Sequence, residues 1–291
     1  MNYRKATATD ATFIEQLMLE ATTDEKRALG YPCWDLTDNL KDINQRLEDV
    51  MLIAKDLHQP VGVAGIFDAS WGTYFIGPIF IESHHTQENY EDFLAKILAQ
   101  NPDFSKKLAV DTKGSNLVLK QALENSGFNV TYAGVSMFYD LTTHVQMEIP
   151  AEIVEITVKH GDFIQQINEL FTAYLVPWQG KGENDLRERL ADGMRVAVVT
   201  EEKKVVGAVV WEFADGSGEI EYLCVDERYQ GKGYGRMLLT NCKNLMACEL
   251  STEAENRIYL DVAQKNQVAQ DFYRSQGFQV EYLRQVYRMG K

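Results

Sequence analysis

The sequence predicts an α/β fold of two tandem domains, each built on a mixed β-sheet. Three observations lead to this prediction: an internal repeat, an alternation of apolar strands with amphipathic helices, and a glycine-rich loop that joins a strand to a helix in one copy only. The length of 291 residues suits two domains of about 145 residues each.

The internal repeat is strongest in two segments, Leu108–Val130 and Ile258–Val280, which match without a gap at an offset of 150 residues. In each segment a short apolar strand ends at an aspartate, an asparagine opens a helix, and a glycine ends that helix. Six positions are identical: Asp111/Asp261, Asn116/Asn266, Val118/Val268, Gly127/Gly277, Phe128/Phe278 and Val130/Val280. The repeat therefore indicates a duplicated domain.

The rest of the chain repeats more weakly. Val61–Phe67 resembles Val205–Trp211, because each is an apolar strand that follows a turn. The pattern breaks near Thr142–Pro150. The sequence therefore predicts a first domain over residues 1–141, a linker over 142–150 and a second domain over 151–291.

The order of elements in the second copy follows from its periodicity. We expect strands at 153–159, 195–200, 205–213, 218–225, 258–262 and 279–289, and helices near 162–174, 184–191, 232–247 and 267–276. Strand–helix alternation late in the copy, after a run of strands, predicts a mixed sheet with helices on both faces.

Charge and composition exclude several classes of protein. The net charge is −14, from 43 acids and 29 bases, so a nucleic-acid-binding surface is disfavoured. The acidity suits a cationic or neutral small partner, although solubility alone also explains it. The longest apolar runs, such as Tyr74–Ile81, are far shorter than a membrane helix, and the N-terminus lacks the pattern of a signal peptide.

The four cysteines, Cys33, Cys224, Cys242 and Cys248, form no CxxC pair. This usage suggests a reducing, cytoplasmic setting. The five histidines show no HExxH spacing, so we expect no metal site.

The most informative segment is the loop that follows the apolar run Leu223–Val225. Three glycines alternate in it, and a helix begins directly afterwards. Glycine lets backbone N–H groups approach a ligand closely, and a helix N-terminus favours an anion. Three cations lie in this part of an acidic chain: Arg228, Lys232 and Arg236. The loop therefore suits a pyrophosphate, but it fits neither the GxxxxGK[ST] phosphate loop nor the dinucleotide fingerprint.

The run Gln230–Gly235, with sequence QGKGYG, resembles the acetyl-CoA loop Q/R-x-x-G-x-G/A of the GNAT superfamily of N-acetyltransferases. A second motif, N-x-x-A-x-x-F-Y-x-x-x-G-F, is matched from Asn266 to Phe278. The resemblance covers residues 151–291. It implies an enzyme that transfers acetyl from acetyl-CoA, its only cofactor, directly to a primary amine: a small amine, a protein N-terminus or a lysine. The alternative is a non-catalytic acyl-CoA-binding sensor or scaffold.

The resemblance also implies roles for individual residues. The backbone of Leu223, Cys224 and Val225 would align pantetheine, and an N–H there would polarise the thioester. Tyr273 would protonate the leaving thiolate, although core packing also explains a tyrosine there. Asn266 would bind pantetheine or cap the last helix. The pyrophosphate would be held by Gln230, Gly231, Lys232, Gly233, Tyr234, Gly235 and Arg236.

The base is sought among two strand acids, Glu219 and Glu221. They share a face unless a bulge intervenes, and either might remove the ammonium proton directly or through water. Cys224 is expected on the opposite face, which disfavours a covalent cysteine mechanism.

The first copy is predicted to be degenerate. If Ile81 aligns with Val225, its loop Glu82–Tyr90 contains no glycine, and Leu123 stands where the second copy has Tyr273. We expect His84 and His85 to lie in a solvated loop without catalytic function. The first domain should therefore not bind acetyl-CoA in the family's manner.

Acceptor choice in this family is implied to depend on the segment between the first two helices, here Phe171–Gly182. The candidate pocket residues are Tyr174, Trp178, Trp211 and Glu212, with Trp34 or Trp71 of the first domain.

Overall fold

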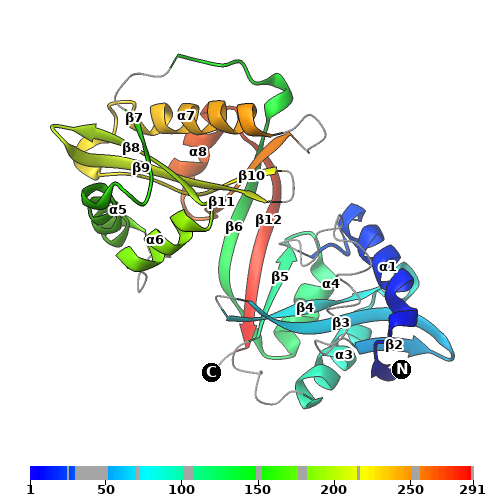
Figure 1. Cartoon of the computed structure of the whole chain (residues 1–291). Helices are drawn as coiled ribbons and strands as arrows, with labels where there is room; N and C mark the ends of the chain where they lie inside the picture. The colour runs from blue at the N-terminus through cyan, green and yellow to red at the C-terminus, as the bar shows by residue number, and fades with distance from the viewer. Residues whose placement is uncertain are drawn as a thin grey trace. The chain divides into compact units, whose positions relative to one another are not determined.

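The computed structural model describes residues 1–24, 26–29, 52–69, 72–100, 108–148, 153–175, 182–214, 217–250 and 256–289. The chain divides into two compact units (Figure 1). Unit 1 contains Met1–Val135, Ala263–Lys265 and Tyr282–Lys291, and unit 2 contains Ser136–Val262 and Asn266–Glu281. Both combine strands with helices, as the sequence predicts.

The first copy runs through strands, one early helix and two later helices. Its elements are β1 (Asn2–Lys5), α1 (Ala11–Thr23), β2 (Leu52–Asp56), β3 (Gln59–Ala69), β4 (Gly72–Phe80), α3 (Gln87–Gln100), β5 (Ala109–Lys113), α4 (Leu117–Asn125) and β6 (Phe128–Asp140). Short 3-10 turns lie at Ala8–Asp10, Glu82–His84 and Leu141–Thr143. The strands β1 to β4 pair antiparallel, and β4 pairs with β5 in parallel.

The second copy repeats this order with one more helix among the described elements. Its elements are β7 (Ile153–Ile156), α5 (Gly161–Tyr174), α6 (Glu183–Ala191), β8 (Arg195–Glu201), β9 (Lys204–Ala214), β10 (Ser217–Val225), α7 (Tyr234–Glu249), β11 (Arg257–Ala263), α8 (Gln267–Ser275) and β12 (Gln279–Met289), with a 3-10 turn at Glu227–Tyr229. The strands β7 to β10 pair antiparallel, and β10 pairs with β11 in parallel. The mixed sheet is therefore confirmed.

The two copies exchange their last strands. In unit 1, β12 pairs antiparallel with β5, so that Val286 lies opposite Asp111. In turn β6 is the neighbour of β11, with a bond from Leu141 N–H to Asn256 C=O of 2.8 Å. The exchange is reciprocal at equivalent positions, because Gly114 N–H donates to Leu283 C=O at 2.6 Å and Gln264 N–H donates to Ala133 C=O at 2.9 Å.

Each unit buries two faces of its sheet. In unit 1, α1 packs Ile14 and Leu17 against one face, and α3 packs Tyr90 and Phe93 against the other. In unit 2, α5 and α6 cover one face, with a core that includes Ile164, Ile167, Phe171, Leu186, Val196, Val198, Ala208, Val210 and Cys224. Leu238 and Met246 of α7 meet Gly207 and Gly218 on the other face.

The repeated asparagines cap equivalent helices. The Oδ1 atom of Asn116 accepts from Leu119 N–H at 3.2 Å, and that of Asn266 accepts from Ala269 N–H at 3.2 Å. Both helices are followed by a glycine with positive φ, 86° at Gly127 and 90° at Gly277. The duplicated pattern in the sequence therefore corresponds to a duplicated local structure.

Two boundaries differ from the sequence prediction. The strand expected at 153–159 ends at Ile156, because His160 Nδ1 accepts from Thr157 N–H at 3.0 Å and turns the chain. The expected division into residues 1–141 and 151–291, with a linker at 142–150, follows the repeat along the chain, whereas the compact units follow the exchanged strands. No helix in the described parts of the chain combines the length and the apolar character needed to cross a bilayer.

The exchanged strand β12 brings Arg284 to the buried carboxylate of Asp111, at 2.6 Å, with side-chain exposures of 14% and 4%. We expect Arg284→Met to lower the free energy of unfolding by about 3–5 kcal/mol, because it removes the cation that compensates a buried charge. Arg274→Met is the matched control. Its pair with Asp271 is exposed at 43% and 65%, so its loss should cost less than about 1 kcal/mol. Equal costs in urea unfolding would contradict this account.

The two caps give a second stability prediction. Asn266→Ala should lower the free energy of unfolding by about 1 kcal/mol, as loss of a helix N-cap usually does. Asn116→Ala should cost more, because Asn116 is fully buried and its Nδ2 also donates to Ala28 C=O at 3.3 Å. Thermal and urea unfolding of both variants check the order, and equal costs would show that capping is the whole contribution at each position.

Candidate active site

The parallel pairing between β10 and β11 is short. It joins Gly218–Ile220 to Ile258–Leu260 and ends there, although β10 continues to Val225 alongside β9. The later residues Leu223, Cys224 and Val225 thus have a backbone edge that β11 does not pair in this register. This edge is where the resemblance implies that pantetheine binds.

The glycine-rich loop leads directly into the N-terminus of α7. Gly231 and Gly233 have φ values of 77° and 92°, which side chains with a Cβ rarely adopt. A Cβ at either position would have no heavy atom within 4 Å, so the space above the loop is open. No side chain caps α7, and its first intrahelical bond runs from Met237 N–H to Gly233 C=O at 3.0 Å.

The N–H groups of Gly235 and Arg236 precede that first bond, at the end of α7 that carries positive partial charge. Gln230 is held by its Nε2, which donates to Val225 C=O at 3.0 Å. A Cβ on Gly235 would lie 3.6 Å from the Phe272 ring, so the loop end packs on α8. The glycine loop expected from sequence therefore leads into a helix N-terminus, as its spacing predicts.

Two of the three expected cations are engaged by acids. Arg228 donates to Asp226 at 3.0 and 2.5 Å and lowers the pKa of that carboxyl to about 2. Lys232 lies 3.1 Å from Glu201, which also accepts from the Tyr234 hydroxyl. Arg236 is exposed and forms no ion pair with any described residue.

The two acids expected to act as a base, Glu219 and Glu221, lie at a β-bulge in β10. The register between β10 and β9 shifts between Ile220 and Tyr222, which makes Glu221 the extra residue. Glu219 lies directly opposite Glu212 of β9, so these two share a face. Glu221 forms an ion pair with Arg189 of α6, and Arg189 also lies 4.0 Å from Glu212. Both expected acids therefore lie on the α6 side of the sheet.

The bulge corrects the expected position of Cys224. Because one extra residue reverses the alternation, Tyr222 and Cys224 face α5 and α6 rather than α7. Burial raises the pKa of the Cys224 thiol to about 12. A thiol that stays protonated is a poor nucleophile, which agrees with the expectation that Cys224 does not act covalently.

Tyr273 lies inside α8, 9% exposed, with its ring centroid 5.3 Å from that of Phe272 and 5.6 Å from that of Phe278. Burial is the largest cause that raises the pKa of its phenol, and the neighbouring Cys242 adds to it. Among the described residues no hydrogen bond or ion pair joins Tyr273 to Glu219, Glu221 or the loop. The ring thus packs in the core and the hydroxyl remains protonated.

The first copy lacks this cradle for a structural reason. Ile81 N–H donates to Val61 C=O at 3.0 Å, as Asp226 N–H donates to Val206 C=O at 2.9 Å. Ile81 therefore corresponds to Asp226, and not to Val225 as the sequence alignment assumed. From the 3-10 turn that follows, α3 begins at Gln87, three residues after His84, whereas α7 begins five residues after Tyr229. The shorter connection has no room for the glycine loop.

The two histidines lie in a connection whose residues Glu82, Ser83 and Thr86 are exposed, and they are themselves half-buried. His85 Nδ1 lies 2.8 Å from the Tyr90 hydroxyl, and burial lowers the pKa of the imidazole. His84 bonds Ser83 at 3.0 Å and Asp56 at 3.3 Å. Both histidines thus hold the loop in place.

A segment of the chain itself fills the first copy's gap between parallel strands. β4 and β5 pair at Tyr74 and Ala109, and beyond this point Leu29 forms an antiparallel bridge with Thr112. The backbone of this segment is held by Asn116 Nδ2, which donates to Ala28 C=O at 3.3 Å. Arg27 is buried and its Nη1 donates to Phe80 C=O at 3.3 Å. The slot equivalent to the one beside Leu223–Val225 is therefore occupied.

The residues expected to line the acceptor pocket differ in their exposure. Tyr174 ends α5 and is 37% exposed, whereas Trp211 is 1% exposed and belongs to the core. Trp34, Trp71 and Trp178 lie outside the described residues. Sequence reasoning did not single out Arg189, because an arginine on an amphipathic helix carries no signal of its partner.

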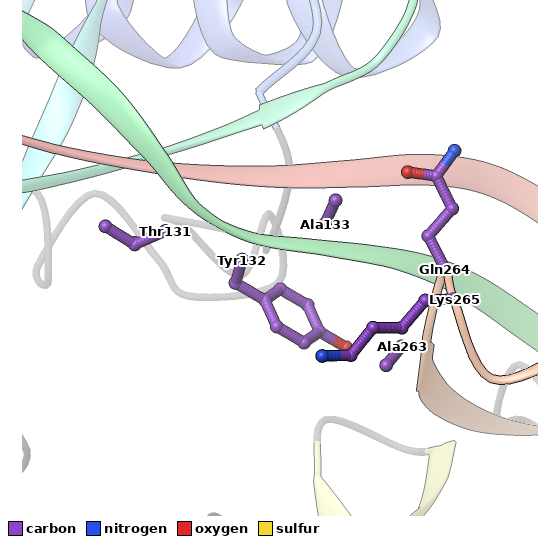
Figure 2. A pocket seen from close by; sticks show the side chains of 6 residues that line it. All are labelled: Thr131, Tyr132, Ala133, Ala263, Gln264 and Lys265. Carbon is purple, nitrogen blue, oxygen red and sulfur yellow. The ribbon is translucent and has the colours of Figure 1, made fainter.

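Among the described residues, no group of three or more His, Cys, Asp or Glu side chains is placed to hold a metal ion. A cavity of about 430 Å³ in unit 1 is lined by β6 and the chain after β11, and Figure 2 shows the Tyr132 ring beside Lys265 in its wall.

Two comparisons with known proteins, one with a family model and one with a relative of known activity, identify the family. Residues 164–278 match the model of the acetyltransferase (GNAT) family. The ribosomal protein bS18-alanine N-acetyltransferase of Haemophilus ducreyi is 30% identical over 127 residues, which cover 42% of this chain and 83% of that protein.

Solved structures match along both copies. A GCN5-related N-acetyltransferase from Sphaerobacter thermophilus has a TM-score of 0.66 at 13% identity, over 98% of this chain and 94% of its own. A tandem GNAT protein from the clavulanic acid biosynthesis pathway has a TM-score of 0.62 at 13% identity, over 98% and 97%. Similarity at this identity shows the tandem fold alone. With the 30% identical relative, the family model and the loop geometry, the chain belongs to the GNAT family of acetyltransferases.

Proposed function

We propose that this protein is an acetyl-CoA-dependent N-acetyltransferase that acylates a primary amine, with its chemistry in the second copy, residues 151–291. The observation that carries the proposal is the uncapped N-terminus of α7, which follows two glycines with positive φ and lies after the unpaired end of β10. The proposal assigns the pyrophosphate to the backbone of residues 230–236, because the positive partial charge of a helix N-terminus favours an anion.

Pantetheine would bind along Leu223–Val225. The first copy supports this assignment, because its own segment Arg27–Leu29 lies in the equivalent slot and its Ala28 carbonyl accepts from Asn116 Nδ2. Asn266 caps its helix with Oδ1 in the same way. The proposal therefore gives Asn266 both roles: Oδ1 caps α8, and Nδ2 donates to a pantetheine carbonyl.

The transfer itself needs a neutral amine, a polarised thioester and a protonated leaving group. A backbone N–H at Leu223–Val225 would polarise the carbonyl. Tyr273 would protonate the thiolate, and its buried phenol keeps the proton at any working pH. The side of the sheet facing α6 carries Glu219, Glu221 and Glu212, which favours an acceptor that arrives as a cation.

Acceptor class and setting are part of the proposal. The Haemophilus ducreyi relative is named for acetylation of an alanine of ribosomal protein bS18, so peptides with a free N-terminus are tested beside small amines and lysine. Among the described residues Cys224, Cys242 and Cys248 are free thiols, which suits the cytoplasm. We assign no cofactor chemistry to the first copy, whose β6 strand is nevertheless needed beside β11.

The assay that tests the function measures thiol release from acetyl-CoA over a panel of peptides, diamines and amino sugars. Turnover that depends on one amine class supports the enzyme. Tight acetyl-CoA binding without turnover on any acceptor would instead favour a sensor or scaffold.

Calorimetry should give one acetyl-CoA per chain. The second copy offers the loop, whereas Arg27–Leu29 fills the first copy's slot. Gly233→Glu should abolish binding, because it adds bulk at φ 92° and a negative charge beside the phosphates. A Ser83→Glu change at the equivalent turn of the first copy is the matched control and should leave binding intact. A stoichiometry near two would contradict the assignment.

Tyr273→Phe should lower kcat by roughly 10²–10⁴-fold, because it removes only the proton donor. The KM for acetyl-CoA should change little, since the ring and its packing on Phe272 and Phe278 remain. Tyr287→Phe, which removes another buried tyrosine hydroxyl in unit 1, controls for stability effects. An unchanged kcat in Tyr273→Phe would return this residue to a packing role.

A further inference from the structure

Glu221, the acid in the bulge of β10, already forms an ion pair. Glu221 is 16% exposed and forms its ion pair with Arg189, which reaches it from α6. A carboxylate held in this way has part of its lone-pair capacity occupied by a guanidinium. Geometry therefore makes Glu221 a poor proton acceptor for an incoming substrate.

A second carboxyl lies beside this pair and is more accessible. Glu212 of β9 is 40% exposed, and its Oε2 lies 4.0 Å from Arg189 Nη2. The same Arg189 Nη2 forms the ion pair with Glu221, so both carboxylates lie beside one guanidinium. Burial raises the pKa of Glu212, the charge of Glu221 raises it further, and Arg189 acts in the opposite direction.

We propose that Glu212 is the group that accepts the proton of the acceptor ammonium, and that Arg189 is a positioning residue that holds Glu221 beside it. The inference rests on the proposed acetyltransferase function and names the base of that same site. It replaces the two strand acids expected from sequence by their cross-strand neighbour.

The proton balance of the step is complete. The ammonium gives one proton to Glu212, directly or through one water, and the neutral amine attacks the thioester carbon. The C–S bond breaks, and the thiolate takes a proton from Tyr273. The second proton lost by the acylated nitrogen restores Tyr273, so Glu212 alone releases a proton to solvent in each turnover.

The charged and titratable groups that face Glu212 come from two elements. Arg189 comes from α6, and Glu219, Glu221 and Tyr222 come from β10. Arg195 of β8 lies opposite Trp211 and pairs with Glu249 of α7, so it belongs to the other face. Besides burial, Glu221 raises the pKa of Glu212 and Arg189 lowers it, which allows opposite shifts to be produced by mutation.

The experiment measures the pH profile of kcat/KM for the full-length protein with its best acceptor. Because the base acts as a carboxylate, kcat/KM should fall as the pH drops below the pKa of Glu212, and this fall is the acidic limb of the profile. Glu212→Gln should lower kcat/KM by roughly 10²–10⁴-fold and remove the acidic limb. Acetyl-CoA affinity by calorimetry and the melting temperature should stay near wild type and exclude misfolding.

Two variants should move the limb in opposite directions. Glu221→Gln removes a negative neighbour that disfavours the carboxylate, so the limb should shift to lower pH. Arg189→Met removes the cation that favours the carboxylate, so the limb should shift to higher pH, and Arg189→Lys should restore it in part. Arg187→Met, which breaks the exposed Glu183–Arg187 pair on the same helix, is the matched control and should leave the profile unchanged.

Three results would overturn the inference. The limb would persist in Glu212→Gln if the acceptor amine itself, or Glu219, determined it. Loss of the limb in Glu221→Gln alone would assign the base to Glu221. Shifts of the same sign in Glu221→Gln and Arg189→Met would contradict the electrostatic arrangement. Absence of thiol release by the wild type with every acceptor is a different result, which would overturn the proposed function itself.

Discussion

The site depends on one constraint in the sheet, which is that β10 cannot pair with β11 along its full length. Parallel pairing stops at Ile220 and Leu260, and the bulge at Glu221 follows at once. The extra residue reverses the alternation, so the acids and Tyr222 all come to the side covered by α5 and α6. The same interruption leaves the backbone of Leu223–Val225 without β11 as a partner. A regular strand would turn Tyr222 and Cys224 to the opposite face from Glu219.

Much of this arrangement could be predicted from the sequence, where the signal was local. The QGKGYG loop predicted a tight glycine turn that opens a helix, and the structure has this turn, with positive φ at Gly231 and Gly233, because glycine spacing acts over a few residues. Helix caps are local in the same way, so Asn116 and Asn266 were located correctly at the starts of α4 and α8. Period-2 and period-3.6 patterns were sufficient for the order of strands and helices.

The sequence could not predict the contacts between residues that are far apart along the chain. No pattern along the chain reveals that Arg189 reaches Glu221, that Arg27–Leu29 enters the first copy's slot, or that a bulge moves Cys224 to the other face. The alignment of Ile81 with Val225 was wrong by one residue for the same reason. The hydrogen bonds between strands, which the sequence does not show, make Ile81 equivalent to Asp226. The exchange of β6 and β12 was equally invisible, because both strands follow their own helices without a change in composition.

The exchange of strands gives the first copy a structural role, although its connection Glu82–Thr86 has no glycine loop. Each copy ends with a strand that completes the sheet of the other, with bonds from Gly114 to Leu283 and from Gln264 to Ala133 at equivalent positions. A single copy on its own would expose an unpaired strand edge and would meet that need by trading strands with a second molecule. The chain therefore has the architecture of a strand-swapped homodimer joined into one polypeptide. The last strand of each copy is therefore needed by the sheet of the other, whether or not that copy carries a glycine loop.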